Sequence, residues 1–262
     1  MMNIVETFIK GKRDAAHCED GIVLTPHYAA VIDGSTSKTP FCLSPTMRNG
    51  RYAMTLISEY IGAMPHDATC GDFCKGITQV IADEYRRAGV HDRMEAHPEE
   101  RLCASAIVYS DVRHEVWMVG DCQAIVDGTF YDNAKPYEQD IARRRAALIL
   151  SGMPPVEARR AIEPLLIAAM REGQNREYAV IDGTTVYMPG VIVVPAAHSV
   201  VLASDGYPVL LPTLCESEAA LARQIERDPQ NVSEFIATKG IVEGNCSFDD
   251  RAYIRLRLSV SE

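Results

Sequence analysis

The chain has 262 residues, of which 47% are hydrophobic, and its formal net charge is −10 at pH 7. This size and apolar content can bury a sizeable core, so we predict one domain spanning residues 1–262. The acidic balance argues against a nucleic-acid partner, which would need clustered Lys and Arg. No stretch approaches about 18 uninterrupted apolar residues, and residues 1–12 lack the apolar centre of a signal peptide, which argues against a membrane partner and favours a cytoplasmic location.

The eight cysteines are scattered, and several lie in apolar runs, so we expect reduced thiols rather than disulfides. Cys70 and Cys74 have no second ligand pair at the spacing of a zinc site. We therefore expect these two side chains to pack at the start of a helix.

The first half of the chain alternates between β-type and helical patterns. Amphipathic helices are expected at about 49–64 and 72–87, where apolar residues recur on one face. From Cys103 the period becomes that of β-strands, and we expect an antiparallel meander that closes on the turn Asp127-Gly128. The strands expected in this half are 21–24, 28–32, 104–109, 115–119 and 123–126.

A helical pair is predicted as an insertion at about 137–173, with its two helices meeting at Pro154-Pro155. Its arginines, Arg143 to Arg145 and Arg159-Arg160, stand out against the acidic whole. Solvated helix faces are the favoured interpretation, and a basic platform that receives phosphorylated substrate is the alternative. The expected elements beyond it are strands after 177, helices near 216–227 and 232–238, and a last strand through Leu258.

Four short acidic segments are spread along the whole chain, and most of them adjoin an apolar, β-favouring run. Carboxylates gathered at the ends of buried strands would repel one another without a cation. Mg²⁺ and Mn²⁺ prefer such oxygen ligands, and metal-assisted hydrolysis is the simplest function for the site. The segments are Glu19-Asp20, Asp33-Gly34, Ser204-Asp205-Gly206 and Asp249-Asp250.

The sequence Val-Ile-Asp-Gly occurs twice, ending at Gly34 and at Gly183. The first copy leads into a polar loop and has Glu19-Asp20 upstream, which favours Asp33 as a metal ligand. The second copy is followed by another strand-like run, so we expect a hairpin there. On this interpretation the substitution Asp182→Asn is expected to be nearly silent.

The acidic segments, together with Met118 to Ala124 and in this order along the chain, resemble the metal-dependent serine/threonine protein phosphatases of the type 2C class. The resemblance implies an α/β fold with a central antiparallel β-sandwich of two sheets, flanked by helical pairs. It also implies phosphate monoester hydrolysis by a water bridged between two Mg²⁺ or Mn²⁺ ions. The partner would be a phosphorylated protein or a small phosphorylated substrate.

The resemblance also assigns roles to individual residues. Asp33 would bridge two metal ions, Asp205 would hold the first ion, and Asp249 would complete the catalytic carboxylates. Asp250 is favoured as a hydrogen-bonding turn residue. The full implied metal set is Glu19 (through water), Asp33, Gly34 (through its carbonyl), Asp205, Asp249 and, for a third and weaker ion, Asp121.

Two positions depart from the family pattern. Ser35 stands where animal members have a proton-donating His, and serine is a poor general acid. Ala15 stands where the phosphate-holding Arg is expected, which leaves Arg13 and His17 as weak candidates for phosphate binding. These departures keep an alternative open, namely a weak or inactive phosphatase-like module that binds a phosphorylated partner.

Overall fold

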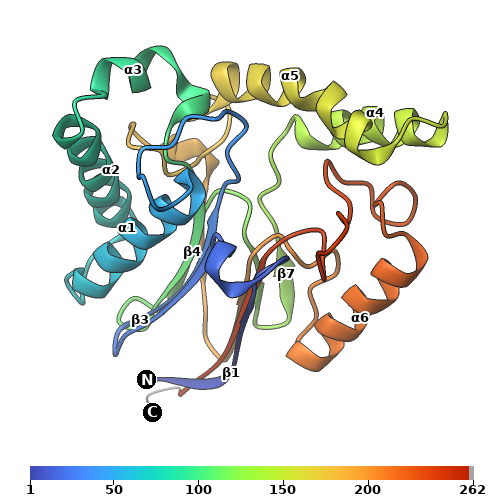
Figure 1. Ribbon diagram of the computed structural model, residues 1–262. Helices are drawn as coiled ribbons and strands as arrows, with labels where there is room; N and C mark the ends of the chain where they lie inside the picture. The colour runs from blue at the N-terminus through green and yellow to red at the C-terminus, as the bar shows by residue number, and fades with distance from the viewer. Residues whose placement is uncertain (260–262) are drawn as a thin grey trace.

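The computed structural model describes residues 1–259 and contains two five-stranded antiparallel sheets packed face to face (Figure 1). The predicted two-sheet sandwich flanked by helices is confirmed. The first sheet has the order β1 (Met2–Lys10), β10 (Arg251–Leu258), β9 (Ser199–Ala203), β6 (Gln123–Val126) and β7 (Thr129–Tyr131). The second has the order β2 (Asp20–Leu24), β3 (Tyr28–Gly34), β4 (Ala104–Ser110), β5 (Glu115–Val119) and β8 (Val191–Pro195).

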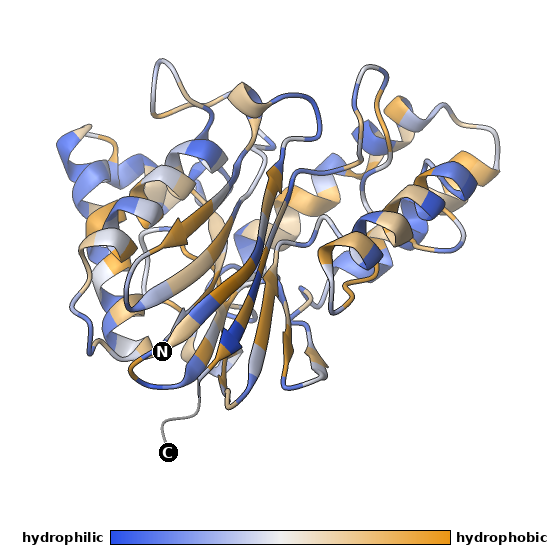
Figure 2. Ribbon diagram, turned by 90° about the horizontal axis from the view of Figure 1, so that it is seen from below, coloured by the Kyte–Doolittle hydropathy of each residue, from blue (hydrophilic) through white to orange (hydrophobic). Residues whose placement is uncertain are grey.

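Strand β3 shows how the sequence builds the core. Its side chains alternate between two buried surfaces, because successive residues of a strand point to opposite faces. Ala29 and Val31 pack between the sheets, whereas Ala30 and Ile32 pack in the layer toward the helices. Figure 2 shows hydrophobic residues concentrated along the strands, while the helices carry both hydrophobic and hydrophilic residues.

Helices α1 (Asn49–Ala63) and α2 (Cys70–Arg87) cover the second sheet on the side opposite α6 (Leu214–Arg227) (Figure 1). Thr69 begins α2 with a capping box, in which its side chain and that of Asp72 satisfy each other's backbone N–H groups. Cys70 and Cys74 are buried at the start of this helix, as expected. All eight cysteines lie within the described residues and are free thiols.

The predicted helical pair is present as α4 (Glu138–Leu150) and α5 (Pro155–Gly173). The two helices pack through Ile141, Ile162 and Leu166 and lie across the top of the sandwich in Figure 1. The remaining short helices are α3 (His91–Ala96), η1 (Ala15–His17), η2 (Pro98–Glu100) and η3 (Met188–Gly190). None of the helices within residues 1–259 combines the length and the apolar character needed to cross a membrane.

The expected antiparallel meander is wrong, because β6 lies in the other sheet. Strands β4 and β5 form a hairpin, but β6 pairs with β7 and β9. The chain changes sheets at Gly120, whose φ of +93° favours glycine, and a Cβ at this position would lie 2.1 Å from Ser105 Oγ. Apolar periodicity does not distinguish a continuing sheet from a crossing at such a turn.

Two further local predictions are wrong, and two strands, β1 and β7, were missed. Residues 232–238 form no helix, because the Asp228 carboxylate accepts hydrogen bonds from the backbone N–H groups of Val232, Ser233 and Glu234. The second Val-Ile-Asp-Gly copy forms an isolated bridge between Ile181 and Ala104 instead of a hairpin. The N-terminal strand β1 pairs with β10 and was not predicted.

Candidate active site

The acidic segments meet at one edge of the sandwich because of strand register. Asp20 lies directly opposite Asp33 in the β2–β3 pair. Strands β9 and β10 are antiparallel neighbours, so the end of β9 and the start of β10 share an edge. Asp205 follows β9 by two residues and Asp249 precedes β10 by two. Four segments separated by up to 230 residues in sequence are thereby brought to one end of the core.

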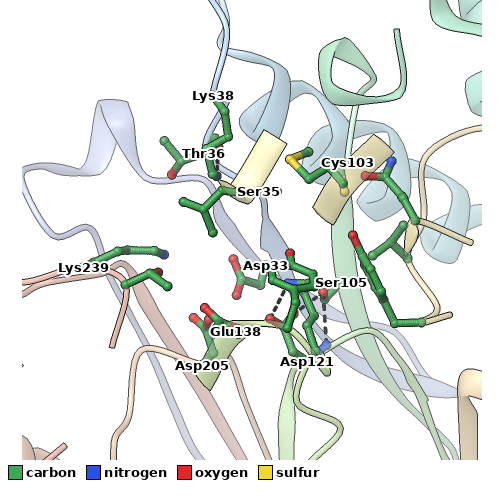
Figure 3. A pocket seen from close by; sticks show the side chains of 18 of the residues that line it. Asp33, Ser35, Thr36, Lys38, Cys103, Ser105, Asp121, Glu138, Asp205 and Lys239 are labelled. Carbon is green, nitrogen blue, oxygen red and sulfur yellow. Dashed lines mark hydrogen bonds and ion pairs between the residues drawn. The ribbon is translucent and has the colours of Figure 1, made fainter. Parts of the chain in front are cut away.

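A cavity of about 60 Å³ lies between this edge and helix α5 (Figure 3). Asp33, Asp121 and Asp205 line its floor, and Gly34 lies beside them. A Cβ at Gly34 would lie 2.3 Å from the Gly50 carbonyl oxygen, so this position requires glycine. Helix α5 contributes the opposite wall through Arg159, Leu166 and Met170.

Burial and mutual repulsion raise the pKa of two carboxylates at this edge, Asp33 and Asp20. Burial raises the pKa of Asp33 well above its usual value, and the charges of Asp205 and Asp20 raise it further. Burial also raises the pKa of Asp20 to about 7, although a hydrogen bond with Ser204 opposes that shift. Glu19 Oε1 and Asp20 Oδ2 are buried without a hydrogen-bond partner among the described residues. Clustered and unsatisfied carboxylate oxygens are the donor set that fits a hard divalent cation.

Lysine side chains approach the same carboxylates. Lys12 Nζ lies 3.0 Å from Asp249 Oδ1, and Lys239 forms an ion pair with the other oxygen of Asp249. Lys135 forms an ion pair with Asp121. Among residues 1–259, no three His, Cys, Asp or Glu side chains are arranged closely enough to hold a metal ion as they stand. Asp249 and Asp121 face ammonium groups, so a cation would have to displace these contacts.

Asp250 and Glu19 are fixed by hydrogen bonds. The Asp250 carboxylate accepts hydrogen bonds from the backbone N–H of Lys12 at 2.7 Å and of Glu19 at 3.1 Å. This is the hydrogen-bonding role favoured from the sequence, and it ties both N-terminal segments to β10. The Thr36 hydroxyl donates to Glu19 Oε2 at 2.6 Å, which leaves the other oxygen of Glu19 without a partner.

The two weak candidates for phosphate binding do not point toward the carboxylate cluster. Arg13 and His17 are exposed, and both side chains pair with Asp14. The basic residue of this loop that reaches the cluster is Lys12, the neighbour of Arg13. Phosphate binding by Arg13 and His17 stays a prediction, and the local sequence of the loop does not show which of its basic side chains faces the carboxylates.

Several cavity residues were not identified from the sequence. Lys38, Lys135, Glu138 and Lys239 all line the cavity. Burial, and then the positive charges of Lys239 and Arg159, lower the pKa of Lys38 to about 7. Lys38 had a local signal, because it ends the polar run that follows Asp33-Gly34. The other three come from loops and a helix start, and only the fold brings them to the site.

Asp182 lies in a separate network. Its side chain is fully buried and forms an ion pair with Arg101 at 2.9 Å. It also accepts hydrogen bonds from Gln174, Asn175 and Thr184. Asp182 therefore joins the segment after α5 to the loop before β4, and the expectation that its substitution is nearly silent does not fit this burial.

Comparisons with known proteins identify the fold. No protein-family model matches the chain, and no curated protein matches it. Among solved structures, serine/threonine phosphatase Stp1 from Staphylococcus aureus shares 12% identity, with a TM-score of 0.50 over 100% of this chain and 96% of that chain. A bacterial serine phosphatase shares 13% identity, with a TM-score of 0.50 over 100% of both chains. The chain has the bacterial serine/threonine phosphatase fold. The sandwich fold that the family resemblance implied is thus confirmed, at an identity that establishes the fold alone.

Proposed function

We propose that this protein is a Mg²⁺- or Mn²⁺-dependent phosphate monoester hydrolase that acts on phosphoserine or phosphothreonine in a protein. The observation that carries the proposal is the meeting of carboxylates from four distant segments at one edge of a phosphatase fold, where Asp33, Asp121 and Asp205 line a cavity. The raised pKa values of Asp20 and Asp33 and the unsatisfied oxygens of Glu19 and Asp20 describe carboxylates that a bound cation would stabilise.

The residues that would hold two ions are Asp33, Gly34, Asp205 and Asp249, with Glu19 acting through water and Asp121 available to a third ion. Bound there, the ions would lower the pKa of a water and offset negative charge on the phosphoryl oxygens. These residues fit Mg²⁺ or Mn²⁺ because acidic side chains and a backbone carbonyl are the oxygen ligands that these cations prefer.

The chain's own basic residues would bind and orient the phosphoryl group. Arg159, Lys38 and Lys239 line the same cavity as Asp33 and Asp205, and an Arg fork matches phosphate oxygens. They take the place of the arginine that is absent at Ala15. Leu166 and Met170 of α5 form an apolar wall that limits the access of water.

Phosphate release from p-nitrophenyl phosphate and from phosphoserine peptides tests the proposal. Turnover should require Mg²⁺ or Mn²⁺, stop on addition of EDTA, and fall by at least about 100-fold in Asp205→Asn, because a lost carboxylate weakens cation binding. Turnover that is unaffected by EDTA would contradict the proposal.

The alternative is a phosphatase-like module that binds a phosphorylated partner without turning it over. The ion pairs of Lys12 and Lys239 with Asp249 favour this alternative, because they already neutralise a proposed ligand. A phosphopeptide that binds tightly but stays intact in saturating Mn²⁺ would identify the protein as such a module.

A further inference from the structure

A second and larger depression of about 370 Å³ lies beside the candidate active site, and we call it the basic groove. The N-terminal end of helix α5 forms one wall, and the loop 239–245 forms the other. Its basic lining residues are Lys12, Arg145, Arg159, Arg160 and Lys239, and its apolar ones include Pro155, Val156, Ile241, Val242 and Phe248.

Two arginines of the basic groove, Arg145 and Arg159, are held by carbonyl oxygens rather than by carboxylates. Arg145 is only 2% exposed, and its guanidinium donates to the Gln230 and Ala237 carbonyl oxygens and not to a carboxylate. Its Nε is buried without a partner among the described residues. Arg159 likewise donates to the Thr238 carbonyl oxygen at 2.8 Å. Carbonyl groups orient a guanidinium without neutralising it.

The local charge balance is opposite to that of the whole protein. Within residues 1–259, no salt bridge involves Arg145, Arg159 or Arg160, and Glu163 is the one acidic side chain that lines the groove. Burial, and then the charge of Arg159, lower the pKa of Arg145 to about 10. In a chain with a net charge of −10, this concentration of cations favours the binding of an anion.

The basic groove is continuous with the candidate active site. Thr36, Arg159 and Lys239 line both the groove and the catalytic cavity. Lys12 also lines the groove and contacts Asp249 of the carboxylate cluster. In a substrate protein whose phosphorylated residue enters the cavity, the residues next to it in sequence would therefore lie in the groove.

We propose that the basic groove binds an acidic peptide segment adjacent to the phosphorylated residue of the substrate. This inference rests on the proposed phosphatase function and specifies its substrate class. Carboxylates of the segment pair with Arg159 and Arg160, and an aliphatic side chain packs between Val156 and Val242, which are both exposed. A small phosphorylated metabolite would fill the cavity and leave the groove empty.

Peptide binding in EDTA tests the groove without any turnover. The probes are fluorescein-labelled peptides without phosphate, one with a Glu-rich sequence and one with Gln at the same positions. Fluorescence polarisation should show the Glu peptide binding at least about tenfold more tightly, with the difference shrinking as salt is raised. Arg160→Glu should remove this preference, whereas Arg144→Glu, a matched charge reversal on the exposed face of α4, should retain it.

Turnover with Mn²⁺ provides the second readout. Phosphoserine peptides flanked by Glu should show a higher kcat/KM than peptides flanked by Gln, and Arg160→Glu should reduce this ratio about tenfold. Equal binding and equal kcat/KM for the two peptides in the wild type would overturn the proposal that the groove binds an acidic segment, but would not contradict the phosphatase function. Absence of all turnover, with the binding preference intact, would overturn the function but not the groove. Tighter binding of a single-stranded oligonucleotide, lost in Arg160→Glu, would overturn the peptide assignment.

Discussion

At the scale of the residue, the two Val-Ile-Asp-Gly copies have the same local sequence, but their aspartates lie in different environments. Asp33 faces the cavity among other carboxylates, and Asp182 is neutralised by Arg101. Asp33→Asn should reduce metal-dependent turnover by at least about 100-fold and leave folding intact, because the cavity loses a charged ligand but keeps its shape.

The substitution Asp182→Asn should act on stability. It leaves the largely buried Arg101 without its counter-charge, which costs about 3 kcal/mol. Thermal unfolding and turnover measured on both variants decide the matter. A stable Asp182→Asn protein without activity would place Asp182, and not Asp33, at the chemistry.

Lys38 introduces a titrating group that the sequence analysis did not anticipate at this site. With a pKa of about 7, its side chain is a cation below pH 7 and neutral above it. The charged groups around it are Lys239, Arg159 and Lys135, while Cys103, whose pKa burial raises to about 12, stays a neutral thiol. The KM for a phosphopeptide should therefore rise between pH 6 and pH 8 as the cation is lost.

Lys38→Arg is the matched variant, since an arginine stays charged throughout this range. It should show a KM that is flat from pH 6 to pH 8, whatever kcat does. A wild-type KM that is independent of pH, or a Lys38→Arg variant that keeps the wild-type rise, would remove Lys38 from phosphate binding.

The acidic residues were predictable because each lies beside a strand that its own apolar neighbours define, as Asp33 and Asp205 do. The lysines were not. Lys239 comes from an irregular loop and Lys135 precedes α4, so neither has a periodic context that fixes its direction. Their placement depends on tertiary packing, which a single sequence does not encode locally.

At the scale of the element, helix α5 must be held in place to form the wall of both the cavity and the groove. Arg171 near its C-terminal end pairs with the buried Glu99 of η2. The hydrogen bond from Arg171 lowers the pKa of Glu99 from 4.5 to about 2. Because the folded-state pKa is depressed, the stability from this pair is fully present above pH 4.5 and is lost as the pH falls toward 2.

Glu99→Gln isolates this contribution. The variant should be less stable than the wild type by about 1 to 2 kcal/mol at pH 7, and the difference should disappear near pH 2. Denaturant unfolding at a series of pH values measures it. A difference that stays constant from pH 7 to pH 2 would show that the pair does not carry the effect.

The helices with clear apolar faces were predicted closely, and the helical pair predicted at about 137–173 is observed as α4 and α5, which together span Glu138 to Gly173. The helix expected at 232–238 failed because of one side chain outside it. Asp228 binds three successive backbone N–H groups and stabilises a non-helical turn instead. A side-chain contact of this kind outweighs a weak helical pattern.

At the scale of the whole molecule, the sandwich places negative charge at the end of its core and lets the loops and α5 supply positive charge around it. The acidic floor comes from strand ends, whereas the basic residues of cavity and groove come from connecting segments and helices. Substitutions in the connecting segments could thus alter the basic residues without moving the acidic ones, because strand register fixes the positions of the strand ends but not those of the connections.

The central claim is that the carboxylates at this edge form a two-ion phosphatase centre. The most direct test is calorimetric titration with Mn²⁺, run in parallel with turnover of p-nitrophenyl phosphate on the same protein. The wild type should bind about two ions with turnover rising as they bind, and Asp33→Asn should lose both binding and turnover. No Mn²⁺ binding by the wild type, or binding that Asp33→Asn leaves unchanged, would contradict the claim.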